Sequence, residues 1–109
     1  MARDQDQTLY IAGHRGMVGS ALVRRLGALG YRNLLTASHA QLDLLDQAAV
    51  NRFFADQTID QVYLAAARVG GIGANRERPA DLYLDNLLMG TYVLDEARRR
   101  ATRKTVMIG

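Results

Sequence analysis

Three glycines near the start of the chain are spaced as in a loop that binds phosphate. Residues 13–19 read Gly-His-Arg-Gly-Met-Val-Gly, a G-x-x-G-x-x-G spacing, directly after a short apolar run. A pyrophosphate has to approach the N–H groups at a helix N-terminus, and a side chain at the turn would block it. We expect Gly13 to permit a tight exit from a strand, Gly16 to admit the phosphate, and Gly19 to let a helix lie against the sheet. The predicted loop residues are Gly13, His14, Arg15, Gly16, Met17, Val18 and Gly19.

Strands and helices are expected to alternate around this loop. Apolar runs predict strands at residues 9–12, 33–37, 62–67 and 105–108. Helical periods predict helices at residues 17–29, after Asp46, and from Pro79 to about residue 100, with residues 68–78 as a loop. The order β-α-β-α-β-α-β favours a parallel sheet with right-handed crossovers, and uniformly apolar strands indicate helices on both faces. We therefore predict an α/β, Rossmann-like, doubly wound fold.

Each predicted helix has an expected apolar face and, in two cases, an expected end signal. Asp46 can cap the second helix, and Gly30 suits the position after the first. The expected buried faces are Val18, Leu22, Leu26 and Leu29 in the first helix, Val50, Phe53 and Phe54 in the second, and Tyr83, Leu87, Leu94 and Ala97 in the third.

The composition indicates one folded domain. Of the 109 residues, 49% are apolar and 23% are charged, and no linker or repeat is visible. The chain has no cysteine, which excludes a disulfide framework, a thiol catalyst and a cysteine zinc site, and suits a reducing cytosol. Residues 1–8 are polar, so we expect no signal peptide, no membrane segment and a cytoplasmic location. The end directly after the fourth strand leads us to expect a truncated domain, with residues 1–109 as its N-terminal part.

Basic residues gather near the C-terminus. The chain has 14 basic and 11 acidic residues, a net charge of +3. Five of the basic residues lie within residues 98–104, so the rest of the chain is slightly acidic. Cations at a helix C-terminus complement its dipole, so we interpret these residues as a solvated helix end. Contact with nucleic acid or another anion is the less favoured alternative.

The end of the second predicted strand bears on cofactor choice. A site for NAD carries an acidic residue there, which accepts a hydrogen bond from the ribose 2′-hydroxyl. This chain has Ala37, Ser38 and His39 instead, so no carboxylate would repel a 2′-phosphate. Ser38 and His39 can donate to that phosphate, and Arg15 can reach toward it. The sequence therefore favours NADP.

Several segments resemble the GDP-L-fucose synthase family, within the extended short-chain dehydrogenase/reductase superfamily. The G-x-x-G-x-x-G spacing is typical of that superfamily, and the more specific segments are residues 11–21, 42–46, 60–67, 69–72 and 79–81. The resemblance covers nearly the whole chain but only the N-terminal part of the family's length. Two departures are that Ala37 and His39 stand where arginines are frequent in the family, and that Arg68 replaces a lysine.

This resemblance implies further cofactor contacts. Asp43 and Leu44 would lie at the adenine, and Val69 near a ribose. Asn86 would lie in the helix behind the active site. Small side chains at the end of the third strand would line the dinucleotide groove, namely Ala65, Ala66 and Ala67.

The resemblance also implies an activity. Members epimerise and reduce GDP-4-keto-6-deoxy-mannose with NADP, as homodimers. Their catalytic Ser, Tyr and Lys, and the Cys and His of epimerisation, would all follow Gly109, so we assign no catalytic residue and no metal ligand here. Two alternatives stay open: a stand-alone NAD(P)-binding module, and another extended short-chain dehydrogenase acting on a nucleotide sugar.

Overall fold

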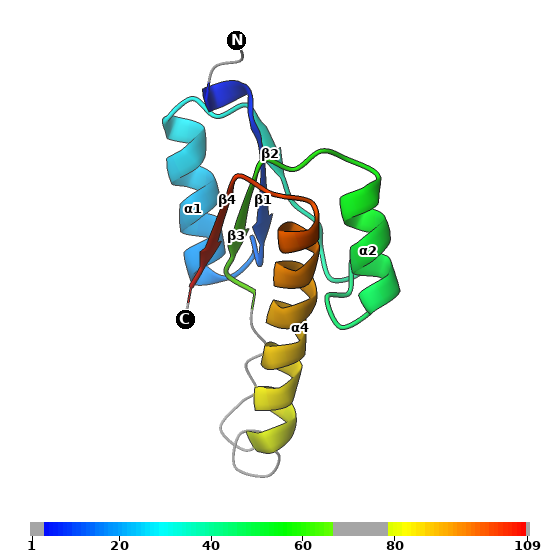
Figure 1. Ribbon diagram of the computed structural model, residues 1–109. Helices are drawn as coiled ribbons and strands as arrows, with labels where there is room; N and C mark the ends of the chain where they lie inside the picture. The colour runs from blue at the N-terminus through cyan, green and yellow to red at the C-terminus, as the bar shows by residue number, and fades with distance from the viewer. Residues whose placement is uncertain (1–3, 67–78, 109) are drawn as a thin grey trace.

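The computed structural model describes residues 4–66 and 79–108, which form a four-stranded sheet between two layers of helices (Figure 1). A short 3-10 helix, η1 (Asp4–Asp6), precedes the sheet. The strands are β1 (Thr8–Ala12), β2 (Asn33–Leu35), β3 (Gln61–Leu64) and β4 (Lys104–Met107). Their order is β2-β1-β3-β4 and every pair is parallel, as the sequence predicts.

β1 lies in the middle of the sheet and is covered on both faces. Its alternate residues Tyr10 and Ala12 face the larger core, which is built from α2 (Gln47–Ala55) and α4 (Pro79–Arg99). Leu9 and Ile11 face the smaller core under α1 (Met17–Ala28). This two-sided burial explains why the first strand reads as a continuous apolar run.

α1 begins and ends within one residue of the prediction. Gly30 has φ +94° just beyond the helix, a conformation that favours glycine there. The predicted apolar face is correct for Leu26, which is buried, and wrong for its two ends, since Val18 is 45% exposed and Leu29 is 49% exposed. Val18 lies in the first turn beside the glycine loop and Leu29 is the C-cap, so neither lies over the sheet.

α2 follows its prediction closely. The Asp46 carboxylate accepts a hydrogen bond from the Ala49 N–H at 3.1 Å, which caps the helix. Val50 and Phe54 are buried and Phe53 packs against the same core.

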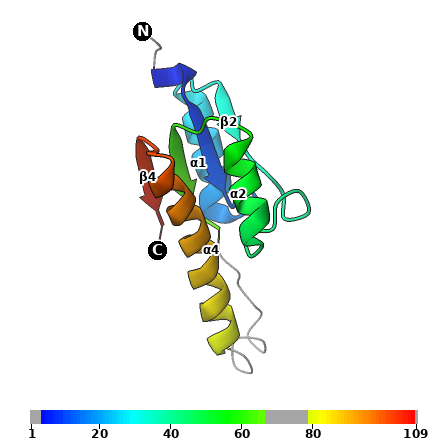
Figure 2. The same ribbon diagram turned by 45° about the vertical axis from the view of Figure 1, so that its right-hand side comes forward.

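α4 has the predicted bounds but a different buried face. Tyr83 is 75% exposed and Leu87 is 57% exposed, which corrects these two members of the predicted stripe. Ala97 is buried as predicted, and Met89 and Val93, which the stripe did not include, are buried as well. A helix of 21 residues is about 30 Å long, and only the C-terminal half of α4 packs on the sheet and α2. Figures 1 and 2 show the N-terminal half projecting past the strands.

Two predicted strands are too long at their carboxyl ends. β3 ends at Leu64 instead of residue 67, and β2 ends at Leu35 instead of residue 37. Ala65 still donates to the Ala12 carbonyl at 2.9 Å, after which β3 and β1 are no longer paired. The predicted loop 68–78 lies outside the described residues. Within the described ranges, no helix is both long and apolar enough to cross a membrane.

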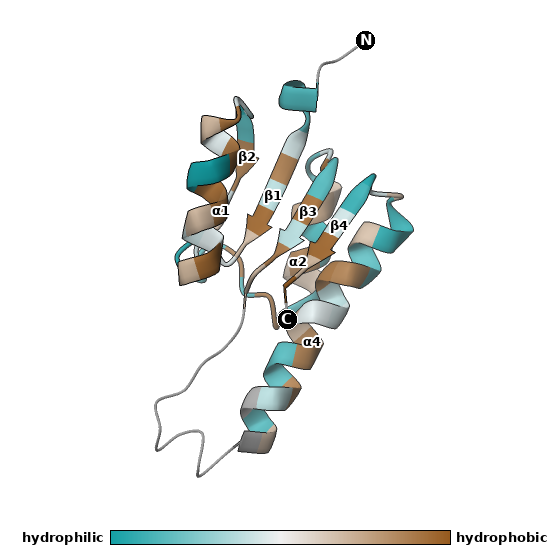
Figure 3. Ribbon diagram, turned by 90° about the vertical axis from the view of Figure 1, so that its left-hand side faces the viewer, coloured by the Kyte–Doolittle hydropathy of each residue, from teal (hydrophilic) through white to brown (hydrophobic). Residues whose placement is uncertain are grey.

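The basic residues at the end of α4 are partly neutralised by acids of the same helix. Arg98 lies 3.1 Å from Asp95, and Arg100 lies 3.0 Å from Glu96. Arg99 reaches both acids, at 3.1 Å and 2.6 Å. These ion pairs fit the interpretation of a solvated helix end. In Figure 3 the neighbouring β4 turns from hydrophilic to hydrophobic along its length, and it is an edge strand with Met107 58% exposed.

Candidate dinucleotide-binding site

The glycine loop joins β1 to α1 by a tight turn. Gly13 has φ +87°, a left-handed conformation that glycine adopts without strain. The Gly16 N–H donates to the Gly13 carbonyl at 3.1 Å, and Ser20 then donates to the Gly16 carbonyl at 2.9 Å. Gly16 is the N-cap, so the helix begins directly after it.

Each of the three glycines meets a different environment. A Cβ on Gly13 would lie 2.6 Å from the Ala66 nitrogen, so the close neighbour there is the backbone after β3. A Cβ on Gly19 would lie 1.8 Å from the Gly13 carbonyl oxygen, so this glycine packs against the loop itself, where we expected the sheet. A Cβ on Gly16 would meet only that same oxygen, at 3.5 Å, an ordinary contact. The fold therefore requires glycine at 13 and 19, and leaves space at 16.

The N-terminus of α1 is suited to an anion. The first turn of a helix leaves N–H groups without partners inside the helix, and the dipole makes that end positive. Gly16 offers no side-chain cap, and the first turn holds no acidic residue. Met17, the first helical residue, is 89% exposed. A bound phosphate could therefore reach these N–H groups without displacing a protein carboxylate.

A cavity of about 270 Å³ opens beside this loop, at the carboxyl ends of β1 and β3. The chain passes from β1 to β2 on one side and returns to β3 on the other, so β1 and β3 flank the point where strand order reverses. Ligands of open α/β sheets bind at such points. The cavity is lined by Tyr10, Gly13, His14, Arg15, Gly16, Ala37, Ser38, His39, Leu42, Leu44, Ala65, Ala66 and Met89.

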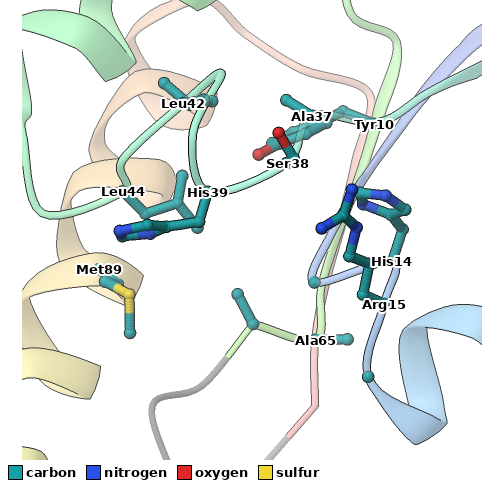
Figure 4. A pocket seen from close by; sticks show the side chains of 13 residues that line it. Tyr10, His14, Arg15, Ala37, Ser38, His39, Leu42, Leu44, Ala65 and Met89 are labelled. Carbon is teal, nitrogen blue, oxygen red and sulfur yellow. The ribbon is translucent and has the colours of Figure 1, made fainter.

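Figure 4 shows how the lining divides. His14 and Arg15 lie on one side, while Leu42, Leu44 and Met89 lie on the other. Among the described residues that line the cavity, none carries a carboxylate. One side can therefore meet phosphate, and the other offers apolar surface to a flat ring.

Most of the predicted cofactor residues are brought together here. Nine of them line the cavity: Gly13, His14, Arg15, Gly16, Ser38, His39, Leu44, Ala65 and Ala66. The lining does not include Met17, Val18, Gly19 or Asp43. Ala67 and Val69 lie outside the described residues.

Four lining residues are not among the predicted cofactor contacts: Tyr10, Ala37, Leu42 and Met89. Ala37 was placed at the end of the second strand but was given no contact. Leu42 and Leu44 lie on either side of Asp43 in the sequence. The alternation of apolar residues around Asp43 could therefore have indicated that both leucines line the site. Met89 lies three residues after Asn86, which places it close to the same face of α4. Tyr10 gave no signal, because an aromatic residue in a buried strand is ordinary core.

Asp43 shapes the cavity wall. Its carboxylate accepts a hydrogen bond from the Leu45 N–H at 3.0 Å, and its carbonyl accepts from the Asp46 N–H at 3.0 Å. These bonds hold the turn that carries Leu42 and Leu44, both of them buried. Its predicted place at the adenine stays a prediction.

Ser38 is held in a small turn of its own. Its N–H donates to Oε1 of Gln41 at 2.8 Å, and its hydroxyl accepts from the Gln41 N–H at 3.3 Å. His39 and Arg15 are exposed. Among the described residues, no acidic side chain forms a salt bridge with Arg15. Arg15 on the glycine-loop side, and Ser38 and His39 after β2, therefore offer donors that an anion can use, and Figure 4 places His39 beside Leu44.

Comparison with known proteins gives the family. Residues 9–109 match the family described as the NAD dependent epimerase/dehydratase family. The chain belongs to this family.

Two curated relatives and one solved structure illustrate the similarity. GDP-L-fucose synthase of Escherichia coli (strain K12) is 46% identical over 94% of this chain and 32% of its own length. GDP-L-fucose synthase 1 of Arabidopsis thaliana is 44% identical over 97% of this chain and 33% of its own length. The structure of a GDP-mannoheptose C4 reductase from Campylobacter jejuni, with NADP bound, superposes with a TM-score of 0.91 at 32% identity, covering 99% of this chain and 32% of that one. The chain thus spans about a third of these relatives.

Proposed function

We propose that this chain is the NADP-binding portion of an epimerase/reductase that converts GDP-4-keto-6-deoxy-mannose to GDP-L-fucose. The observation that carries the proposal is the glycine loop, whose Gly16 keeps open space at an uncapped helix N-terminus beside the cavity. Its 46% identity to a GDP-L-fucose synthase supports the choice within the family.

In this proposal each part of the site has one task. The N–H groups at the start of α1 bind the pyrophosphate. Arg15, Ser38 and His39 bind the 2′-phosphate, which selects NADP over NAD. Leu42, Leu44 and Met89 contact the adenine ring, with Asp43 at its edge. The small residues 65–67 leave room for the dinucleotide.

Catalysis would also require the Ser, Tyr and Lys that the resemblance implies in the remaining part of the enzyme. NADPH supplies the hydride for reduction of the 4-keto group. Residues 4–66 and 79–108 contribute cofactor binding and orientation. We also propose that the full-length enzyme is a homodimer, which rests on the family resemblance. We propose a cytoplasmic location as well, which the absence of cysteine in the chain supports.

The first test measures cofactor binding to the purified protein by NADPH fluorescence. We expect saturable binding of NADPH, weaker binding of NADH, and no binding of either to Gly16→Val. Absence of NADPH binding by the folded wild-type protein would overturn the proposal.

The second test measures turnover in the full-length protein that carries this chain. We expect NADPH-dependent conversion of GDP-4-keto-6-deoxy-mannose. A second candidate substrate is a 4-keto GDP-heptose, because the GDP-mannoheptose reductase is 32% identical to this chain. Conversion of the heptose alone would favour that second candidate, and binding without any turnover would favour a stand-alone NAD(P)-binding module.

A further inference from the structure

Tyr10 lines the cavity from the central strand β1. It is the third residue of β1 and is only 1% exposed, yet its side chain is part of the cavity lining. The apolar wall formed by Leu42, Leu44 and Met89 lies beside it in the lining. Tyr10 therefore belongs both to the core and to the candidate site.

The ring of Tyr10 is fixed by two phenylalanines of α2. Its centroid lies 4.8 Å from that of Phe53, with the rings tilted by 53°. It lies 6.0 Å from the centroid of Phe54, in an edge-to-face arrangement at 88°. Aromatic pairs at these separations attract one another, so the hydroxyl points in one set direction.

The Tyr10 hydroxyl forms no hydrogen bond with any residue in the ranges 4–66 and 79–108. Burial raises the pKa of this phenol well above its ordinary value of 10.0, so it keeps its proton and remains a donor. The hydroxyl is not one of the fully enclosed polar atoms that lack a partner in the described part of the chain, so its oxygen is accessible from the cavity, where a ligand can accept its hydrogen bond.

Tyr63 shows that this sheet satisfies a buried phenol elsewhere. Tyr63 lies on β3 and faces the smaller core, on the opposite side of the sheet from Tyr10. Its hydroxyl donates to Oε1 of Gln61 at 2.9 Å. The difference between the two tyrosines is that the Tyr10 side chain ends at a cavity.

We propose that the Tyr10 hydroxyl is a recognition contact for the purine ring of the bound dinucleotide, made where the Tyr10 side chain reaches the cavity. A purine presents nitrogen acceptors along its edge, and the phenol O–H can donate to one of them. The apolar wall would then hold the ring faces, and Tyr10 would fix how the ring is turned. This inference rests on the proposed cofactor site and adds a specificity-determining residue to it.

The test compares a ligand that has the purine with one that lacks it. Titration calorimetry measures binding of 2′,5′-ADP and of inorganic pyrophosphate to the wild-type protein, Tyr10→Phe and Gly16→Val. Tyr10→Phe removes only the hydroxyl and retains the ring between Phe53 and Phe54. We expect it to bind 2′,5′-ADP about fivefold to tenfold more weakly and pyrophosphate with unchanged affinity.

The outcomes separate this inference from the proposed function. If the wild-type protein binds neither ligand, the proposed cofactor site fails. If Gly16→Val loses binding while Tyr10→Phe matches the wild-type affinity for both ligands, the role of Tyr10 fails and the cofactor site stands. An equal loss for both ligands in Tyr10→Phe would mean a structural role and would also overturn the inference.

Thermal unfolding without ligand supplies the matched control. Tyr63→Phe removes a hydroxyl that has a protein partner, so we expect its Tm to fall. Tyr10→Phe removes one that has none, so we expect its Tm to be unchanged or higher. A fall in Tm for Tyr10→Phe as large as that for Tyr63→Phe would contradict the inference.

A measurement on the wild-type protein avoids dependence on either variant. Tyrosine labelled with ¹³C at the ζ carbon reports on each phenol by NMR. We expect 2′,5′-ADP to shift the signal that is assigned to Tyr10 by its contacts with the rings of Phe53 and Phe54, and pyrophosphate to leave that signal unchanged. Absence of that shift at saturating 2′,5′-ADP would overturn the inference.

Discussion

Gly19 in the first turn of α1 touches the carbonyl group of Gly13 through backbone alone. A Cβ on Gly19 would lie 1.8 Å from the Gly13 oxygen and 2.5 Å from its carbonyl carbon. Side chains cannot be accommodated at such separations without movement of the backbone. The backbone of α1 therefore packs directly against the backbone that follows β1, beside the proposed phosphate site.

Gly19→Ala should destabilise the protein by about 2 kcal/mol or more, because either the loop or the helix must shift. A loss of stability would be informative, because alanine inside a helix is otherwise more favourable than glycine by about 1 kcal/mol. Urea unfolding followed by circular dichroism measures the change. Gly27→Ala is the matched control, because Gly27 lies in the same helix with nothing within 4 Å of an added Cβ. It should be neutral or stabilising by up to about 1 kcal/mol, and equal stability of the two variants would contradict the packing described.

Substitution of Gly16 should reduce cofactor binding with little effect on the free energy of unfolding. Its φ of −74° is open to any residue, and an added Cβ would make only an ordinary contact. We expect Gly16→Ala and Gly16→Val to change the free energy of unfolding by less than about 1 kcal/mol. We expect Gly16→Val to lose NADPH binding, because its branched side chain would fill the approach to the helix N-terminus. Wild-type affinity in a folded Gly16→Val protein would exclude the pyrophosphate from this position.

Local chemistry explains which features were predictable. The tight turn at Gly13, the Asp46 cap and the buried run of β1 each depend on neighbours in sequence, and all three are correct. The buried face of α4 depends instead on how far the helix extends beyond the sheet, which periodicity does not reveal. The predicted stripe therefore included Tyr83, which is 75% exposed.

The site was predictable where one segment supplies it and less so where distant segments meet. Residues 13–16 and 37–39 line the cavity as expected from their places after β1 and β2. Tyr10 and Met89 join it from a core strand and from a helix far along the chain. Their contribution depends on tertiary packing, and no spacing in the sequence links them.

Glu96 should make the stability of the protein depend on pH. It is 3% exposed and joins α4 to α2, where Asn51 donates to its carboxylate at 3.1 Å and 3.3 Å. Burial acts to raise its pKa, but hydrogen bonds from Asn51 and Arg100 and the charges of Arg99 and Arg100 outweigh burial, so the pKa is lowered from 4.5. A carboxylate with a lower pKa in the folded state stabilises the protein above its unfolded pKa. That stabilisation is lost as the pH falls through the folded pKa.

Urea unfolding between pH 7 and pH 3 should therefore show stability falling below about pH 4.5, and falling less steeply in Glu96→Gln. At pH 7 we expect Glu96→Gln to be less stable by about 1–3 kcal/mol. Asp95→Asn is the control, since Asp95 pairs with Arg98 and Arg99 at the surface, where such pairs contribute less than about 1 kcal/mol. A pH dependence that is unchanged in Glu96→Gln would show that other carboxyl groups control acid unfolding.

Arg15 should decide between NADP and NAD. It lines the cavity on the same side as the glycine loop, and the residues after β2 offer no carboxylate to oppose a 2′-phosphate. A charge-assisted hydrogen bond contributes about 1.5–3 kcal/mol, so Arg15→Ala should bind NADPH at least about tenfold more weakly. NADH lacks the 2′-phosphate, so its affinity should stay within about twofold of the wild-type value. Fluorescence titration of both cofactors measures this, with Arg24→Ala as a control, because Arg24 is exposed on α1 and outside the cavity lining. An equal loss for both cofactors would place the Arg15 guanidinium at the pyrophosphate they share, and selectivity for NADP would then have to come from Ser38 and His39.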